Sequence, residues 1–183
     1  MSRHLDMLTR VAEAVGTEQG GFEASSNGEL LTLLKELLMR GAVLIFLGNE
    51  LRGDDAAGLA VGRALAGRVD PERLVLCSEG LESCTSRIKR RKPKLAILVD
   101  AVDAGLPPGS VVVASMRSEG SPPPLSTHSL PKALLLKLLG VEEAWILGVQ
   151  VGSRSVGAPL TPEVAAACSS LAKLLLGLLE KES

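Results

Sequence analysis

Continuous apolar runs alternate with amphipathic segments from residue 42 to the end of the chain. The runs are rich in Val, Ile and Leu, which is typical of strands buried on both faces of a sheet. The segments between them have the apolar spacing of helices that pack on such a sheet. This pattern predicts strands at 42–47, 74–78, 95–100, 110–115 and 144–151. It predicts helices at 54–66, 81–91, 130–139 and 161–179.

The alternation of strand and helix predicts an α/β fold. We expect a twisted, largely parallel sheet that is flanked by helices on both faces, which makes a three-layer sandwich. The chain before the first strand has a different pattern: apolar residues recur at helical spacing from Leu5 to Val15 and again over 29–40. We therefore divide the chain into an N-terminal helical extension, 1–40, and an α/β domain, 41–183.

Composition narrows the classes of partner. The 183 residues include 20 basic and 21 acidic side chains, so no strong field attracts nucleic acid or an anionic membrane. Only 2% of residues are aromatic, which argues against a stacking platform for single-stranded nucleic acid. Apolar runs such as 42–47 are far shorter than a membrane span, and the N-terminus is too charged for a signal peptide. We expect a cytoplasmic protein with no nucleic-acid partner and no membrane insertion.

The chain has an odd number of cysteines, Cys77, Cys84 and Cys168, and no Cys-x-x-Cys motif. This count indicates neither a disulfide framework nor a zinc knuckle, and it suits a reducing compartment. Cys77 or Cys84 paired with His128 would be a nucleophile and its base. Because Cys77 lies within an apolar strand, we interpret it as a core residue and predict that the cysteines are not catalytic.

Two acidic residues and a histidine lie where predicted strands and loops reach one edge of the sheet. Asp55 begins the helix after the first strand, Asp100 closes the strand 95–100, and His128 precedes the helix 130–139. Ligands of open α/β sheets bind at the carboxyl ends of the strands. Asp100 there needs a cationic partner or a metal, because a buried unpaired charge is costly. Two carboxylates and a neutral imidazole suit zinc, nickel or manganese better than calcium.

Neighbouring polar residues have simpler interpretations. Asp54 is interpreted as a helix cap, and Asp103 as a group that could orient His128 or a water. The basic run 89–94 is interpreted as a solvated helix end. The segment 48–58 matches neither a Walker loop nor a dinucleotide-binding loop, and no Gly-x-Ser-x-Gly elbow occurs in the chain.

Four motifs follow one another along the chain: Gly-Asn-x-Leu-x-x-Asp-Asp (48–55), Val-Asp-Ala followed by Asp-Ala-Gly-Leu-Pro-Pro-Gly (99–109), Thr-His-x-Leu-Pro (127–131) and Leu-Gly-Val-Gln (147–150). In this order they resemble the motifs of the maturation endopeptidases of [NiFe] hydrogenases, and the resemblance spans about three quarters of the chain. Asp100 with Asp103, and the Thr127-His128 pair, most resemble the branch that serves formate-hydrogenlyase-type hydrogenases.

The resemblance implies an α/β sandwich and an endopeptidase that removes the C-terminal tail of the hydrogenase large-subunit precursor after nickel insertion. The family's metal-contacting and catalytic positions fall on Asp55, Asp100 and His128. The metal is implied to be the precursor's own nickel, used for recognition, and another divalent metal is an alternative in vitro. Ala56 stands where family members often have Gly, and residues 1–40 have no counterpart in the family core.

Two other functions stay open at this point. One is a stand-alone metallohydrolase with a resident metal, and the other is a nickel-binding maturation chaperone or docking protein. The sequence specifies neither the hydrogenase that is processed nor the oligomeric state. No side-chain nucleophile is evident, so we expect a metal-polarised water or carbonyl in the cleavage step.

Overall fold

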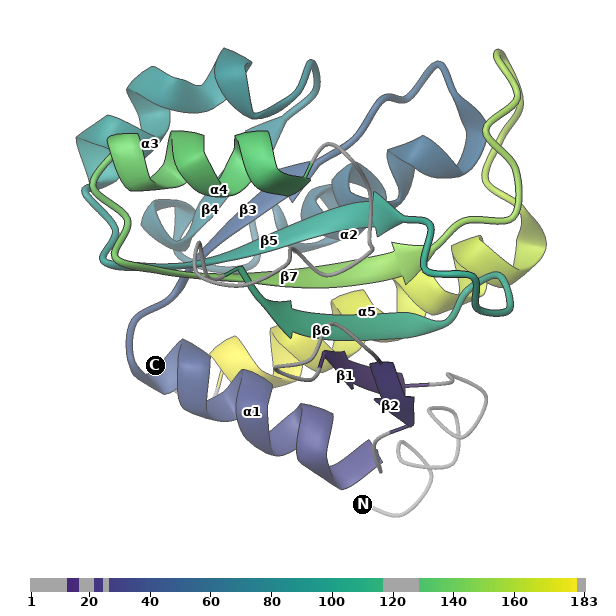
Figure 1. The fold of residues 1–183 in the computed structure, drawn as a ribbon, viewed down its shortest axis with the longest axis horizontal. Helices are drawn as coiled ribbons and strands as arrows, with labels where there is room; N and C mark the ends of the chain where they lie inside the picture. Colours follow the sequence, from purple (N-terminus) through teal and green to yellow (C-terminus); the bar gives the residue numbers. More distant parts are fainter. Residues whose placement is uncertain (1–12, 17–21, 25–26, 117–128, 181–183) are drawn as a thin grey trace.

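The computed structural model describes residues 13–16, 22–24, 27–116 and 129–180 (Figure 1). Within these residues, seven strands form one sheet in the order β2-β1-β6-β7-β5-β3-β4. The central pairs β3–β4, β3–β5 and β5–β7 are parallel, whereas β6 is antiparallel to β7. The strands are β1 (Glu13–Gly16), β2 (Phe22–Ala24), β3 (Val43–Leu47), β4 (Leu74–Cys77), β5 (Leu95–Val102), β6 (Val111–Ser115) and β7 (Glu143–Gln150).

Helices cover both faces of the sheet, as predicted. One face carries α1 (Asn27–Met39), α2 (Ala57–Leu65) and α5 (Pro162–Leu179), and the other carries α3 (Thr85–Arg91) and α4 (Ser129–Leu138). Three short 3-10 turns complete the described part: η2 (Gly53–Ala56), η3 (Pro71–Arg73) and η4 (Leu81–Cys84). The five strands and five helices predicted from residue 29 onward are all confirmed, with boundaries that differ by a few residues.

The strand β3 shows why both faces must be covered. Successive side chains of a strand point to opposite faces. Phe46 packs with the α1, α2 and α5 helices, whereas Ile45 and Leu47 pack with α3 and α4. All five residues of β3 are buried. A continuous apolar run is therefore the sequence of a strand that lies between two helical layers.

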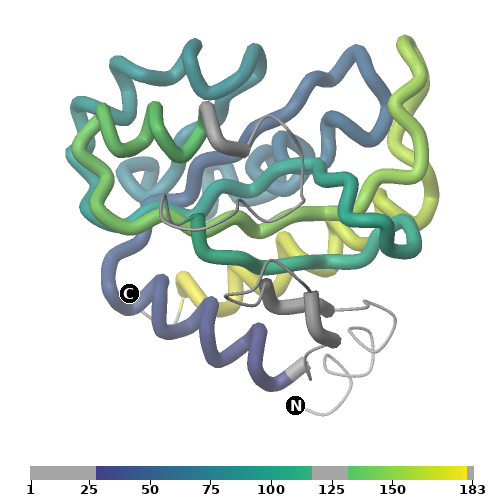
Figure 2. The backbone as a smooth tube through the Cα atoms, viewed as in Figure 1, coloured from purple at the N-terminus to yellow at the C-terminus, as the bar shows by residue number. Residues whose placement is uncertain are grey.

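The helix α5 is long and apolar enough to cross a membrane, judged by length and composition only. In the structure it packs on the sheet and against α2, and its far end lies beside α1 (Figure 2). The buried residues of α5 are Val164, Ala167, Cys168, Leu171, Ala172, Leu175, Leu176 and Leu179. This buried face is what a core helix of the sheet requires.

The N-terminal segment differs from the prediction. The helix expected through Val15 is wrong at its end, because Glu13–Gly16 is the strand β1. This strand pairs in parallel with β6 and antiparallel with β2. The free edge of β6 offers backbone groups with which another strand can pair. The segment 13–16 has only four residues, too few for its apolar spacing to distinguish a helix from a strand. The remainder of the expected helix, before Glu13, lies outside the described residues.

The second predicted helix of this segment, α1, is confirmed. Its inner side chains Leu34, Leu37 and Leu38 are fully buried in the same cluster as β3 and α5. The predicted N-terminal extension is therefore only partly helical, and its described part packs on the core of the α/β unit.

The start of α2 lies directly on the ends of two parallel strands. A Cβ atom at Gly58 would be 2.2 Å from the carbonyl oxygen of Leu47 in β3 and 2.3 Å from that of Val99 in β5. No side chain fits at this position. The contact also has a consequence for the candidate site, because Asp55 precedes Gly58 by one helical turn and Asp100 follows Val99.

We expect Gly58→Ala to lower the free energy of unfolding by at least about 1–3 kcal/mol, because the added methyl group must push α2 away from the sheet. The matched control is Gly177→Ala in α5, where a Cβ would meet nothing within 4 Å. Ala is favoured over Gly by about 0.5–1 kcal/mol in a helix, so the control should be neutral or slightly more stable. Urea unfolding of both variants tests this, and equal stability of the two would contradict it.

Candidate functional site

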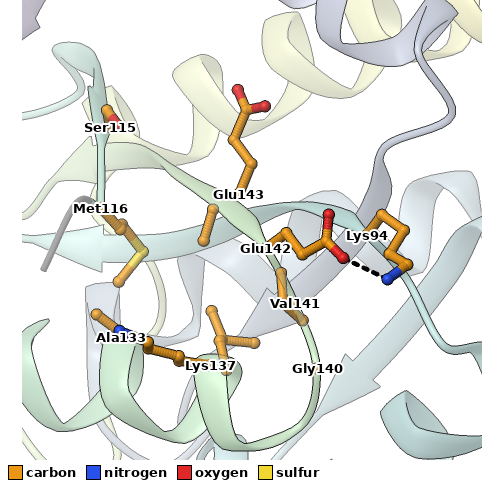
Figure 3. A pocket seen from close by; sticks show the side chains of 11 residues that line it. Lys94, Ser115, Met116, Ala133, Lys137, Gly140, Val141, Glu142 and Glu143 are labelled. Carbon is orange, nitrogen blue, oxygen red and sulfur yellow. Dashed lines mark hydrogen bonds and ion pairs between the residues drawn. The ribbon is translucent and has the colours of Figure 1, made fainter.

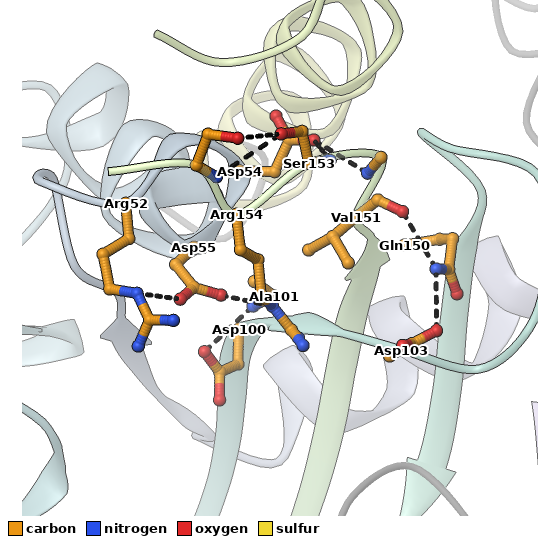
Figure 4. A network of polar contacts seen from close by, with 12 residues as sticks. Arg52, Asp54, Asp55, Asp100, Ala101, Asp103, Gln150, Val151, Ser153 and Arg154 are labelled. Carbon is orange, nitrogen blue, oxygen red and sulfur yellow. Dashed lines mark hydrogen bonds and ion pairs between the residues drawn. The ribbon is translucent and has the colours of Figure 1, made fainter. Parts of the chain in front are cut away.

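Asp55 and Asp100 lie at the carboxyl edge of the sheet, where the sequence predicts them (Figure 4). Asp55 is in η2, which follows β3, and Asp100 is in β5 opposite Gly148 of β7. Their side chains are 21% and 11% exposed. β5 continues to Val102, so Asp100 lies within the strand and does not close it as predicted. The close contact at Gly58 joins the two segments that carry these carboxylates.

His128, the third predicted residue of the site, lies outside the described residues. It is followed immediately by α4, whose first turns contain Lys132. The ammonium group of Lys132 contacts a carboxylate oxygen of Asp100. The beginning of α4 therefore lies close to Asp100.

Each of the two carboxylates has a cationic partner. Arg154, in the loop after β7, places its Nε 2.6 Å from Asp55, and the Nε of Arg52 lies 3.6 Å from the same carboxylate. Asp100 pairs with Lys132 and accepts a hydrogen bond of 2.9 Å from the amide of Ala101. The prediction that Asp100 needs a cationic partner or a metal is met by Lys132. Nothing in the spacing of these three cations along the chain marks them as partners of the carboxylates.

The described part of the chain has no group of three or more His, Cys, Asp or Glu side chains that could hold a metal ion. Asp55 and Asp100 contribute two carboxylates from two segments. A metal contact by Asp55, Asp100 and His128 together thus stays a prediction.

Asp54 is not the helix cap that we predicted. Its carboxylate is fully buried and binds the loop after β7 together with the first residues before α5. It accepts hydrogen bonds from the amides of Gly152 and Ser153, each at 2.8 Å, and from the amide of Thr161 at 2.7 Å. The Thr161 hydroxyl donates a further bond of 2.9 Å. These donors lie about a hundred residues away in sequence, so local pattern does not reveal them.

The pKa of the Asp54 carboxyl reflects two opposing effects. Burial by itself raises this pKa, because it penalises the charged form. The hydrogen bonds from Thr161, Ser153 and Gly152 favour the charged form and outweigh burial, so the pKa lies below its ordinary value. Asp54 is therefore a permanently ionised structural anchor at neutral pH.

Other polar residues near the edge have structural partners. Asp103 accepts a hydrogen bond of 3.3 Å from the side-chain amide of Gln150, which also accepts one of 2.7 Å from the amide of Ala104. The role of Asp103 in orienting His128 stays untested, because His128 is outside the described residues. Ala56 has φ −78° and ψ −6°, which any residue adopts, so this position has no need of Gly.

Two of the cysteines correct the sequence prediction. Cys77 and Cys84 form a disulfide, with their Cα atoms 5.7 Å apart, whereas we expected no disulfide. η4 turns back on the end of β4 and brings the pair together, which spacing along the chain does not show. Cys168 is a buried free thiol, as expected. Burial and the nearby Asp54 carboxylate raise the pKa of this thiol to about 12.

A separate pocket opens at the opposite edge of the sheet (Figure 3). Its volume is about 780 Å³, and Lys94, Met116, Lys137, Glu142 and Glu143 are among its lining residues. Lys94 and Glu142 form an ion pair across its rim. It adjoins the starts of β5 and β7 and thus lies apart from Asp55 and Asp100, which are at the carboxyl ends.

The fold and the site define a class of protein: an open α/β sheet with two carboxylates, Asp55 and Asp100, at the carboxyl ends of its parallel strands. No protein-family model matches the chain. Its sequence is 26% identical over 138 residues to the hydrogenase 3 maturation protease of Escherichia coli strain K12, across 74% of this chain and 88% of that protein.

Solved structures agree with this match. The [NiFe] hydrogenase maturation protease HycI from Thermococcus kodakarensis KOD1 superposes with a TM-score of 0.67 and 26% identity, covering 81% of this chain and 99% of that one. The endopeptidase HycI from Escherichia coli gives a TM-score of 0.64 and 25% identity, covering 74% and 89%. The resemblance to the [NiFe] hydrogenase maturation endopeptidases is thus confirmed in sequence and in fold.

We expect Asp54→Asn to lower the free energy of unfolding by about 2–4 kcal/mol at pH 7, because an amide in place of the carboxylate leaves buried donors poorly paired. A carboxyl with a lowered pKa stabilises the fold above its unfolded pKa of about 3.9, and this contribution is lost as pH falls through the folded value. The gap between wild type and variant should therefore be constant from pH 7 to 5 and shrink below about pH 4.

The control for this prediction is Asp70→Asn, which changes an exposed carboxylate that accepts one hydrogen bond of 2.9 Å from the amide of Glu72. Its effect should stay within about 1 kcal/mol at every pH. Urea unfolding between pH 3 and pH 7 measures both. An Asp54→Asn variant as stable as the control at pH 7 would show that the anchor is unimportant.

Thiol titration with an aromatic disulfide reagent at pH 8 tests the state of the three cysteines. The folded protein should react at none of them, because Cys168 is buried with a raised pKa and the other two are bonded. Unfolding without reductant should release one reactive thiol, and unfolding after reduction should release all three. A fast-reacting thiol in the folded protein is the result that disagrees with this account.

Proposed function

We propose that this protein is the endopeptidase that removes the C-terminal tail of a [NiFe]-hydrogenase large-subunit precursor after nickel insertion. Its relatives are named as hydrogenase maturation proteases and endopeptidases, and on that relationship the chain is a peptidase. The precursor as partner, its nickel as recognition signal and a cytoplasmic location are parts of the proposal.

One observation supports assigning this function to particular residues. Asp55 and Asp100, which match the family motifs, lie at one edge of the sheet on segments that the Gly58 contact holds together. His128 directly precedes α4, and Lys132 of α4 contacts Asp100. This placement supports a shared role for Asp55, Asp100 and His128.

We propose that these three side chains contact the nickel that the precursor carries. Two carboxylates and an imidazole are ligands that nickel accepts. Their contact would fix the precursor's C-terminal region against the edge of the sheet. Recognition of the metal would thereby restrict cleavage to precursors that have already received it.

Hydrolysis then requires that water attacks the scissile carbonyl carbon and that the peptide C–N bond breaks. No described cysteine offers a thiolate for this step, because Cys168 is buried and protonated and the other two are bonded. We propose that water is the nucleophile, and that the precursor's metal would assist it either by activating the water or by polarising the scissile carbonyl. Asp55 or Asp100 would accept a proton from the attacking water and return it to the leaving nitrogen as the C–N bond breaks.

The deciding experiment incubates the purified protein with nickel-loaded precursor and follows the precursor's mass. Loss of a C-terminal tail supports the endopeptidase. Binding without a change in mass would support a maturation chaperone or docking protein instead. Metal analysis of the protein as purified separates the third possibility, since a stand-alone metallohydrolase would retain its own metal.

We expect Asp100→Ala and His128→Ala to slow single-turnover processing at least about a hundredfold, because each removes a metal contact. An imidazole must be neutral to bind a metal, and histidine ordinarily titrates near about pH 6.5, so wild-type processing should fall as pH drops below that range. Rapid-quench assays with nickel-loaded precursor measure both effects.

Matched controls exist in the chain for each change. His4→Ala removes the only other histidine, and Glu50→Ala removes a carboxylate five residues before Asp55 that pairs with Arg63. Both should process at the wild-type rate. Near-normal processing by a folded Asp100→Ala or His128→Ala enzyme would remove the metal contact from the mechanism.

A further inference from the structure

Three cations from three segments already neutralise the carboxylates proposed to meet the metal. Arg154 lies in the loop after β7, Arg52 in the loop after β3, and Lys132 in α4. Figure 4 shows Arg154 reaching from its loop to Asp55, close to the part of β5 that carries Asp100. Three positive charges therefore face the two negative charges of this pair.

We propose that Arg154 and Lys132 determine which metal species can bind. By pairing with Asp55 and Asp100, they would prevent free divalent metal ions from binding these carboxylates. Nickel would bind these carboxylates only when it is already coordinated by ligands of the precursor. This inference rests on the proposed function, in which the metal belongs to the substrate. It assigns to the two cations a positioning role, because they act through Asp55 and Asp100 and not on the scissile bond.

Electrostatics distinguishes a free metal ion from a metal bound in the precursor. A hydrated divalent ion brings its full charge to a site that already has an excess of cations, and like charges a few ångströms apart repel strongly near a protein surface. A metal in a protein site is accompanied by anionic ligands that offset its charge. The repulsion is then smaller, and contacts along the precursor contribute further binding energy.

The cations are placed so that they can be displaced. The side chains of Lys132 and Arg154 are 24% and 38% exposed, so each has solvent into which its charged end can move. Asp100 keeps its hydrogen bond from the amide of Ala101 when Lys132 leaves. The carboxylate therefore retains one fixed backbone partner after the exchange.

Arg154 is the stronger candidate of the two arginines. Its Nε is 2.6 Å from Asp55, whereas that of Arg52 is 3.6 Å away, and the Arg52 side chain is 51% exposed. An exposed, more distant pair contributes little. We therefore assign the principal effects to Arg154 at Asp55 and to Lys132 at Asp100.

Isothermal titration of the full-length protein with nickel chloride tests the proposal. We expect wild type to bind Ni²⁺ weakly, Arg154→Ala and Lys132→Ala each to bind at least about tenfold more tightly, and the double variant more tightly still. The charge-conserving variants Arg154→Lys and Lys132→Arg should restore weak binding. Arg63→Ala is the control, because it removes one exposed cation that pairs with Glu50 and not with Asp55.

Adding Asp100→Asn to the double variant should abolish the gain in affinity, which assigns the bound ion to this site. An unchanged Kd in both single variants would overturn the proposal, as would an equal gain in Arg63→Ala. Processing assays give a second readout. The ratio of the processing rates of nickel-loaded and nickel-free precursor should be smaller for Arg154→Ala and Lys132→Ala than for wild type. Failure of wild type to shorten any precursor would refute the proposed function and leave the calorimetric result to decide the cation effect.

Discussion

The carboxylate of Asp54 accepts hydrogen bonds from three backbone amides and one hydroxyl, all within 2.9 Å, and the rest of the candidate site depends on it. Its donors belong to the loop after β7 and to the residue before α5. Its own amide in turn donates to the carbonyl of Ser153 at 2.9 Å. The chain next to this anchor supplies Asp55 on one side and Arg154 on the other. The ion pair between them is thus a result of the anchor's position.

A second constraint, the contact of α2 with the strand ends at Gly58, relates Asp55 to Asp100. The backbone of α2 approaches the carbonyl groups of Leu47 and Val99 so closely that only hydrogen fits between them. The anchor therefore fixes Asp55 relative to β7 and α5, while the glycine contact fixes it relative to β3 and β5. Two acids separated by 45 positions in sequence come to one edge because both constraints are satisfied together.

The hydrophobic pattern predicts the elements whose residues are buried along their whole length. It does not predict features that depend on contacts between residues far apart in sequence. The apolar run at β3 has the composition of a strand buried on two faces, and it is one. The strand β1 was missed because its partner β6 lies almost a hundred residues away. The donors to Asp54 are equally distant in sequence, so local pattern indicates only a helix cap there. The disulfide between Cys77 and Cys84 follows from the turn at η4, which spacing does not encode.

The candidate site itself was predicted in part. The motif residues Asp55 and Asp100 could be identified from chemistry and position, because an acid in or just after a buried strand needs a partner. Their partners could not, since a lysine in a helix and an arginine in a loop are ordinary surface residues until the fold sets them beside a carboxylate. His128 lies outside the described residues, so its contact with the pair remains a prediction.

Asp54, Asp55 and Asp100 differ in the kind of partner that holds them, and that difference suits the proposed function. Asp54 is bound by the backbone, whose amides cannot leave without unfolding the loop. Asp55 and Asp100 are held chiefly by long cationic side chains with access to solvent, which can exchange for another cation. An acid fixed by the backbone maintains the shape of the site, whereas acids held by mobile cations remain available to a ligand. The sequence places both kinds side by side at Asp54 and Asp55, so a rigid support and an exchangeable charge occupy adjacent residues.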